Sequence, residues 1–188
     1  MRRRFGLPAL ALLLPLAACV PAGPPAAPPE QAEPRQVIRG ANFRDLPARL
    51  LAAHNGIRAE AGMPPLVWDP ALAADAARYG PQLAQLGKLV HASDAERRGA
   101  GETLWMGTTG VFTLEKMVAD WASEERYFRP GVFPDVSTTG KWADVAHYTQ
   151  MIWRDTQRLG CALHPTPKWD YLICRYSPPG NVVGQRMP

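Results

Sequence analysis

The sequence predicts an α+β domain in which helices pack on the faces of a small antiparallel sheet. Apolar residues recur at helical spacing in four segments between residues 43 and 154. Two short runs rich in β-forming residues, 159–164 and 171–176, flank a turn-rich loop. No internal repeat appears. One layered domain therefore accounts for this part of the chain.

The first two helices are predicted on either side of a proline pair at residues 64–65. Helix one covers residues 43–60, where Leu46, Leu50 and Ile57 recur at helical spacing. Asp69 before a proline predicts a capped start for helix two, which continues to about residue 89. Pro81 is expected to kink or break this second helix.

The third helix is predicted to begin at Thr113, whose side chain can cap it. Its apolar stripe consists of Leu114, Met117, Val118, Trp121 and Phe128. A fourth helix is predicted over residues 145–154. All four helices are amphipathic, so each has a face to bury against the sheet.

Three strands are predicted: residues 102–105 and the two strands of a C-terminal hairpin. If the hairpin is symmetric about its loop, residue 159 faces 176 and residue 164 faces 171, so Cys161 faces Cys174. Opposed residues of antiparallel strands lie about 4.5 to 5.5 Å apart at Cα, within reach of a disulfide. We predict a Cys161–Cys174 disulfide, with two buried free thiols as the alternative.

Composition excludes one class of protein and argues against another. The chain has 188 residues, 46% of them hydrophobic and 20% charged, which excludes disorder over its full length. Removing the three arginines at positions 2–4 with a signal peptide would lower the net charge from +4 to about +1. A nucleic-acid binder is not indicated by that charge.

The N-terminus is typical of an exported lipoprotein. Three arginines precede an apolar run at residues 7–18, which is too short to span a hydrocarbon layer of about 30 Å as a helix. Residues 16–19 (LAAC) form a lipobox, so we predict a signal peptide at residues 1–18 and a lipid on the thiol of Cys19. An ordinary secretory signal with an incidental cysteine is the alternative.

Beyond Cys19 the chain is rich in proline and alanine. Residues 19–40 are predicted to form an extended tether, and residues 41–188 the folded domain. Val20 follows Cys19 where aspartate would signal retention in an inner membrane. We therefore expect attachment to an outer membrane, facing the periplasm.

The four histidines are the candidate ligands or bases. His54 lies on helix one beside Asn55 and ahead of Arg58, and it is expected to be a hydrogen-bonded core histidine. His164 is expected to be solvated at a strand end. His91 follows the second helix, and the fourth histidine lies on the fourth helix at position 147. These last two are candidates for metal binding or proton transfer.

Carboxylates that interrupt apolar segments are candidate partners for these histidines. Glu102 lies between a glycine and an apolar pair, and an acid on a buried face needs a partner. Glu124 and Glu125 follow Trp121 by three and four residues, so periodicity does not choose between them. The chain has no G-x-S-x-G, Walker, H-E-x-x-H or C-x-x-C motif, so the common hydrolase, nucleotide and zinc motifs are absent.

Two longer segments carry a resemblance to a known family. Residues 146–153 (AHYTQMIW) resemble the first signature of the CAP superfamily (cysteine-rich secretory proteins, antigen 5, pathogenesis-related 1), and residues 171–182 (YLICRYSPPGNV) resemble the second. Shorter matches follow the family's order over residues 43–183. They are His54-Asn55-x-x-Arg58, residues 101–104 (GETL), Trp121-x-x-Glu124 and Gly160-Cys161.

The resemblance implies a three-layer α-β-α sandwich with a central cleft that holds two histidines and two glutamates. Carried over by motif, these are His91, Glu102, Glu124 and His147, which excludes His54 and prefers Glu124 to its neighbour. In the family the histidines can bind a divalent cation, often zinc or magnesium, as neutral imidazoles backed by carboxylates do. The sequence departs from the pattern at residues 103 and 146 and in an insertion at residues 129–143, which is expected beside the cleft.

Three functions are compatible with these features. The favoured one is a monomeric, lipid-anchored binding domain of a bacterial envelope, without enzymatic activity, whose cleft holds a divalent cation and an apolar or peptidic ligand. The second is a hydrolase in which the tetrad activates water on a bound cation, with Glu102 or Glu124 as the base. The third is a structural envelope protein.

Overall fold

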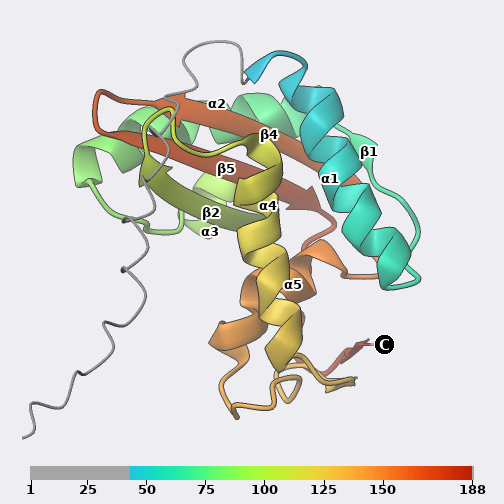
Figure 1. Ribbon diagram of the computed structural model, residues 1–188. Helices are drawn as coiled ribbons and strands as arrows, with labels where there is room; N and C mark the ends of the chain where they lie inside the picture. The colour runs from blue at the N-terminus through green and yellow to red at the C-terminus, as the bar shows by residue number, and fades with distance from the viewer. Residues whose placement is uncertain (1–42, 188) are drawn as a thin grey trace, which may run out of the picture. The chain divides into compact units, whose positions relative to one another are not determined.

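A four-stranded sheet forms the middle layer of the domain (Figure 1). The computed structural model of the chain describes residues 43–187, so the predicted signal peptide, Cys19 and tether lie outside the described residues. The strand order is β1-β4-β5-β2, with β1 (Val67–Trp68), β2 (Gly101–Thr108), β4 (Arg158–Pro165) and β5 (Trp169–Ser177). The sheet is antiparallel except at its edge, where β1 pairs in parallel with β4.

Helices cover both faces of this sheet, as the α-β-α sandwich requires (Figure 1). One face carries α2 (Pro70–Leu86), which packs along β4 and β5. The other face carries α1 (Leu46–Glu60) and α4 (Leu114–Ala122), with α5 (Ala146–Met151) beside them. The predicted fold class is confirmed. Within residues 43–187 no helix has both the length and the apolar character needed to cross a bilayer.

Side chains alternate along β5 and so fill two separate cores. Tyr171 and Ile173 join the core beneath α2, whereas Leu172, Cys174 and Tyr176 join the core beneath α1 and α4. The hairpin of β4 and β5 has the register predicted from its symmetric loop, and the Cys161–Cys174 disulfide is confirmed. Because it belongs to the α1 and α4 side, the disulfide ties the two central strands on that face.

The start of α2 follows the prediction, and Pro81 does not break the helix. The carboxylate of Asp69 accepts from the backbone N–H groups of Ala71 and Leu72, which caps the helix. The helix then continues through Pro81 to Leu86. The preceding residue is Gly80, which has no Cβ to clash with the proline ring, so the helical conformation before the proline is tolerated.

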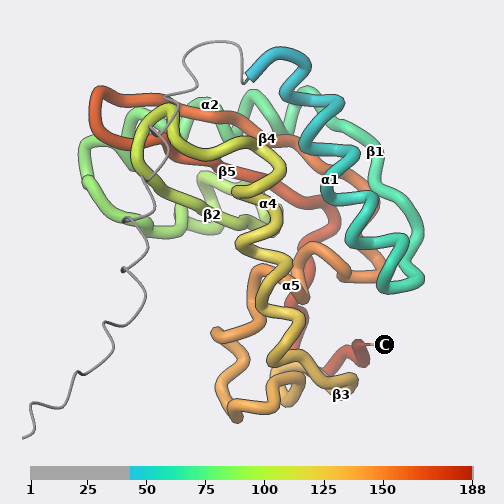
Figure 2. Tube along the Cα trace, in the orientation of Figure 1, coloured from blue at the N-terminus to red at the C-terminus, as the bar shows by residue number. Residues whose placement is uncertain are grey.

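Five short elements lie outside the predicted ones. They are α3 (Asp94–Arg97), the 3-10 helix η3 (Trp142–Val145), and the strands β1, β3 (Gly131–Val132) and β6 (Arg186–Met187), while the 3-10 helix η2 (Ser123–Tyr127) takes the place of the end of the predicted third helix. Figure 2 shows β3 beside the C-terminal end of the chain, where β6 pairs with it. The third helix is regular only to Ala122 and the fourth only to Met151, so both are shorter than predicted.

A buried arginine ties α1 to the segment after α5. The guanidinium of Arg58 donates to the carbonyl oxygens of Pro64 at 2.6 Å, Met151 and Trp153 at 2.8 Å, and Thr156 at 3.1 Å. Burial lowers the pKa of Arg58 to about 10, so it remains a cation at neutral pH. Carbonyl oxygens replace the water that its charge lost on burial.

Candidate functional site

Glu102, near the start of β2, holds the first candidate histidine. One of its carboxylate oxygens accepts from His91 Nδ1 at 2.6 Å and from the backbone N–H of Ala92 at 3.2 Å. The Glu102 side chain is fully buried, whereas that of His91, in the loop between α2 and α3, is 60% exposed. The sheet therefore fixes one side of an imidazole ring whose other side is open.

The second oxygen of Glu102 accepts from Arg175 Nη1, which makes a buried ion pair. Arg175 lies directly opposite Glu102 in the β2/β5 register, and its guanidinium is stacked over Tyr79 of α2. Burial lowers the pKa of Arg175, and the charge of Glu102 opposes that effect. No role was predicted for Arg175, although a charged residue inside an apolar strand was a signal that it needs a partner.

Glu124, on η2, holds the second candidate histidine. Its Oε1 accepts from His147 Nδ1 at 2.6 Å, and its Oε2 accepts from the backbone N–H groups of His147 at 2.9 Å and Tyr148 at 3.1 Å. Helix α5 has Val145 at its N-cap and no capping side chain of its own, so Glu124 caps the helix from outside. The His147 ring also stacks on Trp121, with ring centroids 6.0 Å apart. The structure places Glu124, and not Glu125, against this histidine.

One cleft of about 510 Å³ brings three of the four predicted residues together. His91, Glu102 and His147 line it, while Glu124 lies behind His147. The remaining lining residues are Arg97, Gly101, Trp142, Ala143, Ala146, Gln150, Pro179, Gly180 and Asn181. The insertion at residues 129–143 thus contributes two residues to the wall, positions 142 and 143. Roles for Arg97, Gln150 and Asn181 had not been predicted.

The free ring nitrogens decide what the cleft can do. An ionised carboxylate only accepts, so Nδ1 of His91 and of His147 carries the hydrogen and Nε2 of the neutral ring carries a lone pair. Within the described residues neither Nε2 has a hydrogen-bond partner. Each can therefore accept a proton or bind a cation.

The donors fit an open cation site better than a closed one. Among residues 43–187 no group of three or more His, Cys, Asp and Glu side chains could hold a metal ion. Glu102 and Glu124 are occupied with imidazole Nδ1 atoms, which is the usual outer-shell place of a carboxylate behind a metal-binding histidine. A cation here would be held by His91 and His147, with water completing its coordination.

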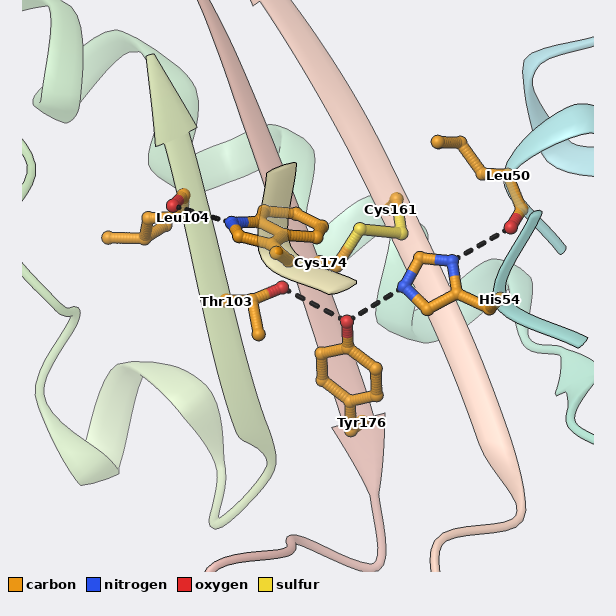
Figure 3. The surroundings of a disulfide bond; sticks show 8 residues. Leu50, His54, Thr103, Leu104, Cys161, Cys174 and Tyr176 are labelled. Atoms are coloured by element: carbon orange, nitrogen blue, oxygen red, sulfur yellow. Dashed lines mark hydrogen bonds between the residues drawn. A yellow bond between two sulfur atoms is a disulfide. The ribbon is translucent and has the colours of Figure 1, made fainter. Parts of the chain in front are cut away.

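His54 does not line the cleft, and neither of its ring nitrogens is free (Figure 3). Its Nδ1 donates to the carbonyl oxygen of Leu50 at 2.8 Å, and its Nε2 is 2.9 Å from the Tyr176 hydroxyl. That hydroxyl also contacts Thr103 Oγ1 at 3.0 Å. The ring is fully buried, and burial lowers the pKa of His54 to about 4. The neutral imidazole is part of the core.

Asn55, next to His54, joins α1 to the segment before β1. Its side-chain amide donates to the carbonyl oxygen of Leu66 at 3.1 Å, and its side-chain oxygen accepts from the N–H of Leu66 at 2.7 Å. One side chain thus satisfies both backbone groups of a residue outside any helix or strand. With Arg58, the three polar residues of the His-Asn-x-x-Arg motif all serve internal hydrogen bonds.

Comparison with known proteins covers most of the described chain. Residues 51–176 match the profile of the cysteine-rich secretory protein family, CAP. Pathogenesis-related protein 1C of Nicotiana tabacum is 38% identical over 136 residues, which are 72% of this chain and 76% of that protein. Glioma pathogenesis-related protein 1 of Mus musculus is 29% identical over 138 residues, 68% of this chain and 51% of that protein.

Solved structures share the fold at lower identity. A crystal structure of NaASP2 with Zn²⁺ aligns with a TM-score of 0.62 at 24% identity, covering 74% of this chain and 82% of that one. The structure of BmVAL-1 aligns with a TM-score of 0.63 at 20% identity, covering 79% of this chain and 84% of that one. Both likenesses concern the arrangement of helices and strands.

Proposed function

This chain belongs to the cysteine-rich secretory protein (CAP) family, and we propose that it is a lipid-anchored binding domain of a bacterial envelope. Its cleft takes a divalent cation, zinc or magnesium, together with an apolar or peptidic ligand. The observation that carries the proposal is the pair of imidazoles in one cleft, each anchored through Nδ1 and each with an open Nε2.

The anchoring of each imidazole supports cation binding. A carboxylate on Nδ1 fixes the tautomer in which Nε2 is the ligand atom, and it increases the electron density on that atom. Neutral imidazoles bind zinc well, and water completes an open site. The CAP protein NaASP2, which shares the fold, has been crystallised with Zn²⁺. When bound, the cation would polarise a ligand oxygen or water.

The remainder of the cleft supports a ligand with both apolar and amide groups. Trp142, Ala143, Ala146 and Pro179 give the wall an apolar part, and Trp142 is 47% exposed. Polar groups lie among them, and a mixed wall of this kind is typical of sites that fix an otherwise apolar ligand in one orientation. A peptide presents both kinds of group, which favours it over a hydrocarbon.

Zinc binding tests the cation site. Calorimetry on the purified chain should show zinc binding at pH 7.5 that weakens at pH 5.5, because protons compete with the metal for imidazole. His91→Ala combined with His147→Ala should lower the affinity at least about tenfold. His164→Ala is the matched control, because His164 does not line the cleft. Equal affinity in the double variant and the wild type would exclude the two imidazoles as ligands.

Two probes separate the classes of cleft ligand. A short alanine peptide should shift the amide resonances of Ala143, Ala146 and Gly180 at lower concentration than dodecanoate does. The reverse order would favour an apolar ligand. If neither probe shifts these resonances in a chain that binds zinc, the organic ligand is excluded from the proposal and only the cation remains.

Lipid attachment is tested at the N-terminus. Mass spectrometry of the mature N-terminal peptide should show an acylated Cys19, and Cys19→Ser should release the protein from the membrane fraction. The basis is the lipobox at residues 16–19. An unmodified N-terminus beyond Cys19 on a freely secreted protein would show an ordinary secretory signal.

A further inference from the structure

A second pocket lies on the α2 face of the sheet and shares no residue with the cleft. It has a volume of about 270 Å³ and is formed by α2, the region of α3 and β5. Its lining residues are Asp75, Arg78, Tyr79, Gln82, Ala95, Glu96, Arg98 and Arg175. Three guanidinium groups thus surround one small pocket.

One edge of the Arg175 guanidinium is hydrogen-bonded, and the other edge has no partner within the described residues. Its residue is 1% exposed, and Nη1 donates to Glu102. Nε is buried without a hydrogen-bond partner, and Nη2 has none within the described residues. The Nε and Nη2 N–H groups of a guanidinium are parallel donors, and this fork matches two oxygens of one carboxylate or phosphate. A buried donor without a partner is costly, so the free edge indicates a missing acceptor.

The acidic residues in the lining do not supply that acceptor. Asp75 pairs with Arg78 on α2. Glu96 accepts from the backbone N–H of Ser93 at 2.8 Å and from its hydroxyl at 2.7 Å, as the capping box of α3 requires. Arg98, at the exposed rim, forms no ion pair within the described residues. Among residues 43–187, the donors around the pocket that remain without an acceptor are therefore on the cationic side chains of Arg175 and Arg98.

We propose that this pocket binds a small oxyanion, with two of its oxygens on the Nε and Nη2 edge of Arg175 and with Arg98 adding charge at the rim. The ligand is a carboxylate or a phosphate group, since both present two oxygens at the spacing of the fork. The site does not depend on the cation cleft. Glu102 nevertheless links the two, because it accepts from both Arg175 and His91.

The test is an amide-resonance titration of the full chain with inorganic phosphate and, separately, with acetate, at constant ionic strength. At least one anion should give saturable shifts at Tyr79, Gln82 and Ala95 below about 50 mM, which corresponds to weak but specific binding. Saturation by acetate alone identifies a carboxylate ligand, and saturation by phosphate alone a phosphate ligand. Saturation by neither overturns the proposal.

Variants assign the binding to the two arginines. Arg98→Gln should weaken the anion about three- to tenfold, whereas Arg154→Gln, which removes the same charge from an exposed position outside the pocket, should not. Arg175→Lys keeps the charge but lacks the fork, so a folded variant should lose at least about tenfold. Equal affinity in the Arg98 and Arg154 variants would overturn the site even if the Arg175 variant fails to fold. Unchanged anion binding in the His91, His147 double variant would show that this site and the zinc site are separate.

Discussion

The region around His54 and the cleft both contain histidine, but in the first it is part of the core and in the second it is open to a ligand. In His54, His91 and His147 alike, Nδ1 donates to an oxygen that fixes the ring. The difference lies at Nε2, which contacts a phenol hydroxyl in His54 and has no partner within the described residues in the other two. The number of satisfied ring nitrogens, more than burial alone, separates a histidine of the core from one available to a ligand.

Glu102 and Glu124, which anchor the two cleft histidines, are themselves held by different groups. Glu102 is held by the opposite charge of Arg175 inside the sheet, whereas Glu124 is held by two backbone N–H groups at the start of α5. When the glutamate is removed, a buried charged partner is left unpaired, which costs stability, whereas backbone N–H groups at a helix end can form hydrogen bonds with water instead. Removing Glu102 should therefore destabilise the protein more than removing Glu124.

The largest effect is expected at Glu102. Glu102→Ala should lower the free energy of unfolding by about 3 to 5 kcal/mol, because Arg175 is left as an unpaired buried cation. Urea denaturation measures the change. Adding Arg175→Met should recover part of the loss, since it removes the unpaired charge. A double variant as unstable as the single one would show that the ion pair is not the cause.

His54→Ala should cost about 2 to 4 kcal/mol, because it leaves a cavity and removes the hydrogen-bond partner of Leu50 and Tyr176. Zinc affinity should stay that of the wild type. The double replacement of His91 and His147 by alanine should show the converse: lost zinc affinity with less than about 1 kcal/mol of destabilisation. If zinc binding and stability fell together in both proteins, the separation between core and cleft histidines would be wrong.

Acid should destabilise the protein through His54. Its pKa is about 4 in the folded chain and about 6.5 when unfolded, so the unfolded state takes up the proton first as pH falls. Stability is complete above pH 6.5 and is lost as pH falls toward 4. Between pH 7 and pH 5 the expected loss is about 2 kcal/mol. Urea denaturation across this range should give a shallower pH dependence for His54→Gln, and an unchanged slope would contradict the assignment.

The smallest effect separates the neighbouring glutamates. Glu124→Ala should destabilise the protein by about 1 to 2 kcal/mol, because α5 loses its external cap and His147 its anchor. Glu125→Ala, at an exposed position, should cost less than about 0.5 kcal/mol. Thermal unfolding of the two variants measures this difference in stability. A larger loss at Glu125 would mean that the sequence motif points to the wrong residue.

Local patterns were enough to predict the layers of the fold and the disulfide. Helical spacing located α1, α2 and α4, and the symmetric loop placed Cys161 opposite Cys174 because strand side chains alternate with a fixed period of two. The two-residue strands β1, β3 and β6 are too short to show any period. A break at Pro81, one of the two predicted outcomes, does not occur because the glycine before it has no Cβ to clash with the proline ring.

The site was harder to predict because it depends on contacts between distant segments. Spacing left Glu124 and Glu125 equivalent, and only the family motif distinguished them. Arg175 was missed because its role follows from the β2/β5 register, which places it opposite Glu102 across 73 residues of sequence. The contribution of Trp142 to the cleft was hidden in an insertion with no periodic pattern.

The four carbonyl contacts of Arg58 have a consequence for the order in which the chain folds. The helix that carries Arg58 leaves the ribosome early, but three of its acceptors lie more than 90 residues later, at Met151, Trp153 and Thr156. A nascent chain that stops before Met151 offers this cation only the carbonyl oxygen of Pro64, so α1 cannot complete its contacts until most of the domain has been synthesised. Long-range closure of this kind favours late, cooperative folding over stepwise assembly from the N-terminus.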